Sequence, residues 1–538
     1  MLLIFIKGKM INRKIYRTII FSLLVLFVFA FSACEEKETD KRPNIVLIVA
    51  DDMGYSDIGC YGSEISTPSI DKLAENGIRF NKFYNSTRCC PTRASLLTGM
   101  YSHKAGMGKM TLPPGKEGEP GPYQGYLSRN AVTIAEALKS SGYHSYSSGK
   151  WHIGEASENW PLERGFEHYF GLISGASSYF EIIKNQNRKR QMVLDNSPWE
   201  PPSEGFYMTN EITDYAIKWI NEHNTKYDSP FFLYVAYTAP HWPLHALEED
   251  IAKYENAYDI GWDSLRKARN NKQKVLGLIN NQTHLPRRPE NIPAWIDVVN
   301  KTEWSRRMEV YAAMVDRMDQ GIGKIIQKLK DENQFENTLI VFISDNGASN
   351  ENIEKRGLNN PEVPIGLKGS YTAYRAPWAN VSNTPFRDYK KSVYEGGIAS
   401  PFVAHWPVGI KSKGTIINQT SHVVDLLPTI LDISKAKHPN SYNEFEIKPM
   451  DGVSLLPALI DGKSFKREPL FWEHLGNRAI LEENWKLTAP SNKKWELYNL
   501  NTDVSENNNI AEVYSDTVKY LAKKYEDWAI GVGVNEKK

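Results

Sequence analysis

The feature that most constrains the fold is a short apolar run, residues 44–50, which stops abruptly at Asp51-Asp52. The run is rich in β-branched residues and shows no alternation of polar and apolar side chains after its first residue. A strand with this pattern is buried on both faces, as in the middle of a parallel sheet. Helices must then cover both faces, so the sequence predicts a layered α/β fold.

Strand-like and helix-like segments alternate along the chain that follows. Strands are expected over residues 78–84, 143–148, 231–236 and 338–344. Amphipathic helices are expected over residues 69–76, 133–141 and 306–329. This alternation predicts a large central mixed, mostly parallel sheet sandwiched by helices. Residues 245–300 and 350–388 show no clear period, and we expect them to form long loops near the mouth of the site.

The C-terminal part of the chain has a different pattern. Short strand-like runs from Pro469 onward are followed by a helical pattern over residues 513–528. These segments predict a small C-terminal antiparallel sheet with a terminal helix.

The N-terminus has the pattern of a targeting segment. A basic stretch precedes the apolar residues 19–31, a run too short for an ordinary membrane-spanning helix. The run ends in Phe31-Ser32-Ala33-Cys34, which resembles the cleavage site of a bacterial lipoprotein that carries its lipid on Cys34. A plain secretory peptide and an uncleaved anchor are the alternatives. We expect an exported lipoprotein, in the periplasm or at the cell surface, held to the membrane by a lipid anchor on Cys34.

Charge and cysteine content narrow the classes of partner and site. The chain has 65 basic and 64 acidic side chains and a net charge of +1, so nucleic acid is not an expected partner. With Cys34 assigned to lipid, the cysteines Cys60, Cys89 and Cys90 are a poor disulfide framework because their number is odd. The adjacent pair is too close for an unstrained bond, and no Cys/His spacing typical of a zinc site is present.

Polar groups follow the predicted strands. Asp51-Asp52 and Asp345-Asn346 offer oxygen donors, which are the ligands that Ca²⁺ and Mg²⁺ prefer. The alternative is two unrelated strand-end turns, in which Asp and Asn are common. Because the carboxyl ends of strands in an open α/β sheet border one crevice, we expect these groups to meet Lys150, His152 and His241 there.

The most specific motif is Cys89-Cys90-Pro91-Thr92-Arg93, followed by Leu96-Leu97-Thr98-Gly99. The pattern Cys-x-Pro-x-Arg-x-x-Leu-Leu-Thr-Gly resembles the signature of formylglycine-dependent sulfatases. It selects Cys89 because the signature cysteine stands two places before Pro91. Further segments occur in the order seen in that family: Gly149-Lys150-Trp151-His152, Pro240-His241, Ser344-Asp345-Asn346-Gly347 and Tyr389-Lys390. The resemblance extends from about residue 44 to the C-terminal end and is to the arylsulfatase-like branch of the alkaline phosphatase superfamily.

The resemblance implies a modified residue and a metal ion. Cys89 would be converted to formylglycine (3-oxoalanine) by a formylglycine-generating enzyme that reads Pro91 and Arg93. One hydroxyl of the hydrated aldehyde would attack sulfur, and the other would lose its proton so that sulfate is released. The ion would be Ca²⁺, with Mg²⁺ as the alternative. The implied metal ligands are Asp51, Asp52, Cys89, Asp345 and Asn346.

The same resemblance gives roles to three cationic side chains. Lys150 and Lys390 would bind the sulfate oxygens, and Arg93 would hold a hydroxyl of the hydrate. Lys390 is chosen over Lys391 because it lies five residues before Glu395, as in the family pattern.

Two histidines are candidates for proton transfer. His152 would take a proton during sulfate release, and His241 would protonate the leaving alcohol, although the two assignments could be exchanged. Asn477-Arg478 resembles a segment that approaches the site in relatives, and it is a further candidate for contact with substrate.

These observations together predict a sulfuric ester hydrolase that cleaves the S–O bond of aryl or carbohydrate sulfate monoesters. Its substrate would be a sulfated small molecule or a sulfated glycan. The alternatives are a phosphonate monoester or phosphodiester hydrolase of the same superfamily, and an inactive surface-exposed binding lipoprotein. The expected domains are a signal peptide (1–33), a tether (34–43), a sulfatase catalytic domain (44–435) and a C-terminal α+β subdomain (436–538).

Overall fold

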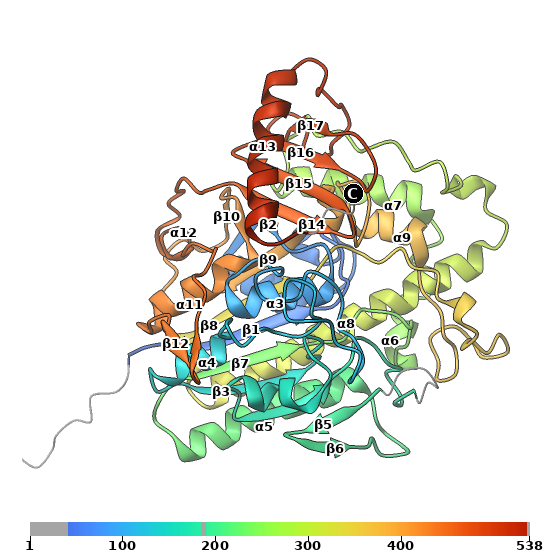
Figure 1. Ribbon diagram of the computed structural model, residues 1–538. Helices are drawn as coiled ribbons and strands as arrows, with labels where there is room; N and C mark the ends of the chain where they lie inside the picture. Colours follow the sequence, from blue (N-terminus) through green and yellow to red (C-terminus); the bar gives the residue numbers. More distant parts are fainter. Residues whose placement is uncertain (1–40, 184–189, 535–538) are drawn as a thin grey trace, which may run out of the picture. The chain divides into compact units, whose positions relative to one another are not determined.

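The computed structural model describes residues 41–183 and 190–534 (Figure 1). Within this part of the chain the main sheet has 11 strands, in the order β10-β2-β9-β8-β1-β7-β3-β4-β5-β6, with β11 paired to β2. The expected signal peptide and the anchor residue Cys34 lie outside the described residues. None of the described helices is long and apolar enough to cross a membrane.

The middle of the sheet consists of four parallel strands in the order β8, β1, β7 and β3. They span Thr338–Ser344, Asn44–Ala50, Phe231–Ala236 and His144–Gly149 respectively. Every residue of β1 is buried, as expected for the apolar run at residues 44–50. This strand lies between two parallel neighbours, so all four strands point their carboxyl ends to the same edge of the sheet.

The outer strands make the sheet mixed. On one side β9 (Ala399–His405) is antiparallel to both β8 and β2 (Ile78–Tyr84), so β2 runs in the same direction as β8. The short strands β10 (Thr415–Ile417) and β11 (Ser421–His422) pair with β2. On the other side lie β4 (His168–Leu172), β5 (Met192–Leu194) and β6 (Ser197–Trp199). The predicted mixed, mostly parallel sheet is confirmed.

Helices cover both faces of the sheet, as Figure 1 shows. One face packs on α2 (Pro68–Asn76), α5 (Met208–Lys226) and α8 (Lys301–Asp331), together with the even-numbered side chains of β1 such as Val46. The opposite face packs on α3 (Cys89–Thr98), α4 (Ile134–Lys139) and α11 (Leu426–Ser434), together with odd-numbered side chains such as Leu47. The two hydrophobic cores thus follow from the period of two along a strand that is apolar at every position after Asn44.

The C-terminal part contains the predicted small antiparallel sheet and terminal helix. Its strands are β14 (Leu470–His474), β15 (Asn477–Glu482), β16 (Trp485–Ala489) and β17 (Glu496–Asn499), and α13 (Ser515–Gly531) covers one face. On the other face, the Trp472 Nε1 donates to the Asn85 carbonyl at 2.7 Å. The small sheet therefore packs directly against the segment that precedes Cys89. The expected boundary at residues 435 and 436 stays a prediction.

The two segments expected to be long loops contain helices. Residues 245–300 include α6 (Glu248–Ala252) and α7 (Gly261–Val275), and residues 350–388 include α9 (Arg375–Ser382). The apolar period of α7 is weak because its buried face carries Arg269 and Gln273 beside Trp262 and Leu265. Its polar groups are satisfied by partners far away in sequence, which a local pattern does not show.

Shorter elements complete the described fold. The helices α10 and α12 span Glu395–Ile398 and Leu456–Asp461, and the strands β12 and β13 span Ser441–Tyr442 and Phe445–Glu446. Short 3-10 helices lie at Gly59–Tyr61, Ser157–Asn159, Pro161–Arg164, Trp295–Asp297, Phe335–Asn337, Glu354–Arg356 and Val423–Asp425.

Candidate active site

The site lies where the four central strands end. Asp51-Asp52 follows β1, Lys150 and His152 follow β3, His241 follows β7 and Asp345-Asn346 follows β8. All of these side chains are buried. The structure therefore brings the polar groups that follow the strands into one cluster, as the topology of a parallel sheet requires. Lys390, from the loop after α9, and the first turn of α3 complete the cluster.

Close backbone packing sets the positions of these strand ends. A Cβ on Gly149 would lie 1.9 Å from the Ala236 carbonyl oxygen, so only glycine allows β3 to end against β7. The Lys150 amide then donates to that carbonyl at 2.7 Å. Asp52 and His152 have φ angles of +64° and +59°, a left-handed backbone that non-glycine residues rarely adopt. Strained residues of this kind cluster at functional sites.

Three cationic side chains are paired with the three buried carboxylates. The Lys150 Nζ donates to the Asp51 Oδ2 at 2.6 Å, and the Lys390 Nζ donates to the Asp52 Oδ2 at 2.7 Å. The third pair is Arg93 with Asp345, whose Oδ2 accepts from the guanidinium Nε at 3.0 Å. Each expected sulfate-binding or hydroxyl-holding residue thus lies beside an expected metal ligand.

Burial and neighbouring charges act on the carboxylates in opposite directions. Burial raises the pKa of Asp51 well above its ordinary value, and the nearby Asp345 charge adds to this, although Lys150 and Arg93 oppose it. At Asp52 burial also acts upward, but Lys390 and His241 outweigh it and the pKa is lowered. The carboxylates repel one another in a dry environment, which is the situation that a bound divalent cation relieves.

The donor set fits a hard divalent cation. The Asn346 amide donates from Nδ2 to the Asp52 Oδ1 at 2.6 Å, which leaves its Oδ1 turned the other way. Among the described residues, neither Asn346 Oδ1 nor Asp51 Oδ1 accepts a hydrogen bond, although both atoms are buried. Buried oxygens without donors are costly unless a cation binds them. The residues present therefore fit Ca²⁺ or Mg²⁺.

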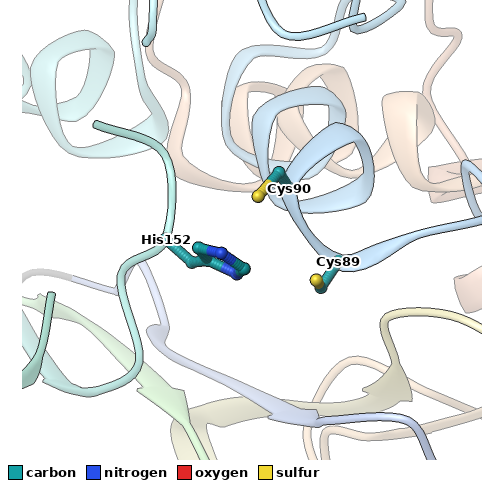
Figure 2. Close-up of side chains that lie close together, drawn as sticks. All are labelled: Cys89, Cys90 and His152. Carbon is teal, nitrogen blue, oxygen red and sulfur yellow. The ribbon is translucent and has the colours of Figure 1, made fainter. Parts of the chain in front are cut away.

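Cys89 is the first residue of α3, and its side chain faces His152. Figure 2 shows the His152 ring pointing toward the sulfur atoms of Cys89 and Cys90. The ligand atoms of these three residues lie within 4.8 Å of one another. A hydrogen bond from Cys90, together with the charges of Lys150, His152 and Lys390, lowers the pKa of the Cys89 thiol well below its usual value, although burial opposes this. The sequence spacing did not indicate this Cys/His cluster, because β3 brings His152 from far along the chain.

His241 is held in one orientation beside Lys390. Its Nδ1 donates to the Trp242 carbonyl at 2.7 Å, so Nε2 faces the site. That nitrogen lies 3.3 Å from the Asp52 Oδ2 and 3.5 Å from the Lys390 Nζ. Burial lowers the pKa of His241 to about 4, with the lysine charges acting in the same direction and Asp52 opposing them. His241 is therefore neutral near pH 7, and its proton acceptor faces a protonated lysine.

The neighbouring residues Lys390 and Lys391 lie in different environments. The Lys390 side chain is 3% exposed and pairs with Asp52, whereas the Lys391 side chain is 37% exposed and pairs with Glu351 at 2.6 Å. Glu351 also accepts from the Trp242 Nε1 at 2.7 Å. Glu351 was not identified from the sequence, because an isolated glutamate in this segment has no distinguishing pattern.

Next to His241, the positively charged side chain of an arginine packs on a tryptophan ring. The exposed Arg356 places its guanidinium carbon 4.3 Å from the ring centre of Trp242. On the C-terminal side, the Asn477 Nδ2 donates to the Lys391 carbonyl at 3.4 Å, so this residue reaches the segment that carries Lys390. Arg478 instead packs over Trp495, with 4.5 Å between its guanidinium carbon and the ring centre.

Comparison with known proteins shows which protein family the chain belongs to. Residues 43–436 match the sulfatase family, and residues 386–529 match the family described as N-sulphoglucosamine sulphohydrolase, C-terminal. The chain belongs to the sulfatase family, within the alkaline phosphatase superfamily, and is an enzyme that hydrolyses sulfate esters.

Particular relatives agree with this membership. The chain is 34% identical to an uncharacterized sulfatase of Schizosaccharomyces pombe, over 93% of this chain and 96% of the relative. It is 35% identical to an arylsulfatase of Klebsiella aerogenes, over 77% of this chain and 91% of the relative. The crystal structure of Ps i-CgsB in complex with k-i-k-neocarrahexaose is 28% identical, with a TM-score of 0.68, and the match covers 91% of this chain and 93% of that one.

Proposed function

We propose that this sulfatase cleaves sulfate monoesters of carbohydrates with a formylglycine at position 89 and a bound divalent cation. The observation that carries the proposal is the placement of Cys89 at the start of α3, facing His152 and within the electrostatic reach of Lys150 and Lys390. The modifying enzyme would read Pro91 and Arg93, and the cysteine two places before Pro91 is Cys89. The motif therefore supports conversion of Cys89 and not of Cys90.

The cation would be held by the oxygens of Asp51, Asp52, Asp345 and Asn346, together with residue 89. When bound, it supplies positive charge against the sulfate oxygens, and the hydrated formylglycine supplies the nucleophilic oxygen and the hydroxyl that permits sulfate release. Ca²⁺ is favoured over Mg²⁺ because the site offers many oxygen ligands held by several different loops, and Mg²⁺ usually keeps more of its water.

The chain's own residues bind the sulfate and move protons. Lys150 and Lys390 bind non-bridging oxygens, which concentrates positive charge where negative charge develops. His152 faces residue 89 and accepts a proton there through its ring nitrogen. His241 and Lys390 form a contact of 3.5 Å in which the proton resides on the lysine, and together they protonate the leaving alcohol oxygen.

A carbohydrate alcohol is supported by two observations. The Ps i-CgsB structure, which this chain resembles over most of its length, contains a neocarrahexaose. In this chain Trp242 lies next to His241, on the leaving-group side, with the Arg356 guanidinium 4.3 Å from its ring centre. An aromatic face and an exposed cation suit a sugar that carries negative charge.

Mass spectrometry of the peptide that contains Cys89, from protein made with the modifying enzyme, tests the proposal. We expect formylglycine at position 89 and a thiol at position 90. Cys89→Ala should abolish the hydrolysis of a sulfated disaccharide, and the matched variant Cys90→Ala should retain most of it. An unmodified Cys89 thiol in fully active enzyme would overturn the proposal, and faster turnover of a phosphonate monoester than of any sulfate ester would favour the phosphonate alternative.

The metal is tested separately by chelation. Removing the cation with EDTA should abolish turnover, and Ca²⁺ should restore it better than Mg²⁺. Free Ca²⁺ at 100 times its dissociation constant should raise the free energy of unfolding by about 2.7 kcal/mol. Full activity after exhaustive chelation, verified by elemental analysis, would contradict the cation's role.

The expected export and lipid anchor remain part of the proposal. The apolar run at residues 19–31 and the following Cys34 support them. Metabolic labelling with a fatty acid should label the wild type and not Cys34→Ser; equal labelling of both would overturn the anchor.

A further inference from the structure

The sulfatase mechanism gives Cys90 no task, yet this residue shares a buried space with Cys89 and His152 (Figure 2). The two sulfur atoms and a ring nitrogen of the histidine lie within 4.8 Å of one another. Thiolate sulfur and imidazole nitrogen are the ligands that Zn²⁺ prefers, in contrast to the carboxylate and amide oxygens on the other side of the site.

We propose that the folded protein with an unconverted Cys89 is a zinc protein, in which Cys89, Cys90 and His152 bind Zn²⁺. The inference rests on the proposed function only in one respect, namely that conversion of Cys89 removes one of the three ligands and so abolishes the zinc site. The same buried residues would then form part of a catalytic centre when Cys89 is converted, and a zinc-binding site when Cys89 stays a thiol.

The distances allow a tetrahedral ion. With Zn–S bonds of about 2.3 Å and a Zn–N bond of about 2.0–2.1 Å, neighbouring ligand atoms lie about 3.5–3.8 Å apart. The observed upper limit of 4.8 Å exceeds this spacing by about 1 Å, so the ligand atoms draw together when the ion binds. Three protein ligands leave one position for water, as in other zinc sites with an open coordination position.

The surroundings hold the ligands in place. Cys89 and Cys90 are the first two residues of α3, and His152 is fixed by its left-handed backbone after β3. The backbone of Gly175 packs on the imidazole, because a Cβ there would lie 2.4 Å from the His152 Cε1. Because the backbone that carries the three ligands is already ordered, less entropy is lost when a metal binds.

Binding is a proton exchange without a redox step. Zn²⁺ forms bonds to two sulfur atoms and one nitrogen, and each of the two thiols gives up its proton, so that a bound zinc and two free protons result. Zinc binds cysteine as the thiolate, so metal binding itself releases the thiol protons.

Cobalt spectroscopy on the full chain tests the inference. The protein is made in a host without the modifying enzyme, and mass spectrometry verifies that Cys89 is a thiol. Co²⁺ replaces Zn²⁺ in tetrahedral sites and shows sulfur-to-cobalt charge transfer only when thiolates bind it. We expect one equivalent of Co²⁺ to produce this band and Zn²⁺ to remove it. At the neighbouring site of Asp51 and Asp52 the expected ligands include Cys89 but not Cys90, so a band from Co²⁺ bound there would not depend on Cys90.

Matched variants assign the ligands. Cys90→Ser should lose most of the band, and His152→Asn should weaken Co²⁺ binding at least about tenfold. Cys60→Ser should keep the full signal, because Cys60 lies outside the cluster. Absence of the band in the thiol protein, or an undiminished band in Cys90→Ser, would overturn the inference.

A comparison of protein that contains formylglycine at position 89 with protein that contains the Cys89 thiol tests the zinc site independently of the proposed function. If Cys89 is converted, the band should be absent from the converted enzyme and present in the thiol form. Equal bands in the two forms would overturn the inference. If Cys89 proves never to be converted, the proposed function fails, whereas a zinc-displaceable charge-transfer band in the thiol protein still supports the zinc site.

Discussion

The Arg93 guanidinium lies against Asp345, with its Nε 3.0 Å and its Nη2 2.9 Å from the carboxylate Oδ2. Both side chains are fully buried. The contact joins α3, which carries Cys89 at its first position, to the end of β8. It therefore fixes the position of the proposed nucleophile relative to the expected metal ligands, in addition to any contact that Arg93 makes with a hydroxyl group.

Replacing Arg93 by Gln should destabilise the protein because it leaves a buried carboxylate without its cation. We expect a loss of about 3–5 kcal/mol in the free energy of unfolding, measured by urea denaturation of cation-free protein. Arg375→Gln is the control: its ion pair with Glu354 is partly exposed, and its loss should cost less than about 1 kcal/mol. Equal effects of the two substitutions would contradict this account. Ca²⁺ should recover part of the loss in Arg93→Gln, because the ion again compensates Asp345.

The neighbouring residues Lys390 and Lys391 should differ sharply in their effect on catalysis. Lys390→Gln removes a buried cation beside Asp52 and His241, and we expect kcat/KM to fall about 100-fold to 1,000-fold. Lys391→Gln removes a half-exposed partner of Glu351 and should change kcat/KM less than about threefold. Turnover of one sulfated disaccharide by both variants, each verified to contain formylglycine, makes the comparison. A greater loss in Lys391→Gln would mean that the wrong lysine has been assigned.

Arg356 should matter for charged glycans and not for small aryl sulfates. Its guanidinium packs on Trp242, and both Glu351 oxygens are already engaged, by Lys391 and by the Trp242 indole. Arg356 also interacts with the Tyr371 side chain, but it is exposed, so its positive charge can meet a second negative group on the substrate. Arg356→Gln should lower kcat/KM about tenfold for a disulfated disaccharide, the value of one charged hydrogen bond.

The control substrates and the control variant isolate that contact. 4-Nitrophenyl sulfate and a disaccharide with a single sulfate should be cleaved by Arg356→Gln at nearly the wild-type rate. Lys355→Gln, at the exposed neighbour in the same 3-10 helix, should change none of the rates by more than about twofold. An equal loss of kcat/KM on every substrate would show that Arg356 supports the local fold around Trp242 and does not bind a negative group of the substrate.

The part of the site that depends on buried strands was predictable from sequence. The ranges expected for the strands ending at Ala236 and Ser344 agree with β7 and β8 to the residue. A strand buried on both faces is apolar throughout and stops where polar side chains begin, so its end is marked locally. Because the carboxyl ends of parallel strands lie at the same edge of a sheet, the ends of these strands also indicated which polar residues lie close together.

The rest depended on contacts distant in sequence, which no local pattern encodes. Helix α7 was missed because its buried face carries Arg269, whose Nη1 lies 2.6 Å from the Asp57 Oδ1. The proximity of Cys90 to His152 needs the course of β3, and the separation of Lys390 from Lys391 needs Glu351. Lys390 itself was found only through the family resemblance, since an isolated lysine is usually a surface charge.

Acid should weaken the fold through buried neutral histidines, and His422 is the clearest case. It is fully buried at the end of β11, its Nδ1 accepts from the Val424 amide at 3.3 Å, and burial together with the Arg467 charge lowers its pKa to about 3. The unfolded chain, with a histidine pKa of about 6.5, binds a proton that the folded protein excludes. Stability from this residue is therefore complete above pH 6.5 and is lost as the pH falls toward 3.

The expected loss is about 1.4 kcal/mol per pH unit below 6.5, which urea denaturation at pH 7.5 and 5.5 measures. His422→Asn keeps an oxygen that can accept from the Val424 amide but does not titrate, so its free energy of unfolding should change about 1.4 kcal/mol less than the wild type between these two pH values. His284→Asn, at an exposed position, should leave the wild-type slope unchanged. The same pH slope in wild type and His422→Asn would show that other groups control the acid sensitivity of the fold.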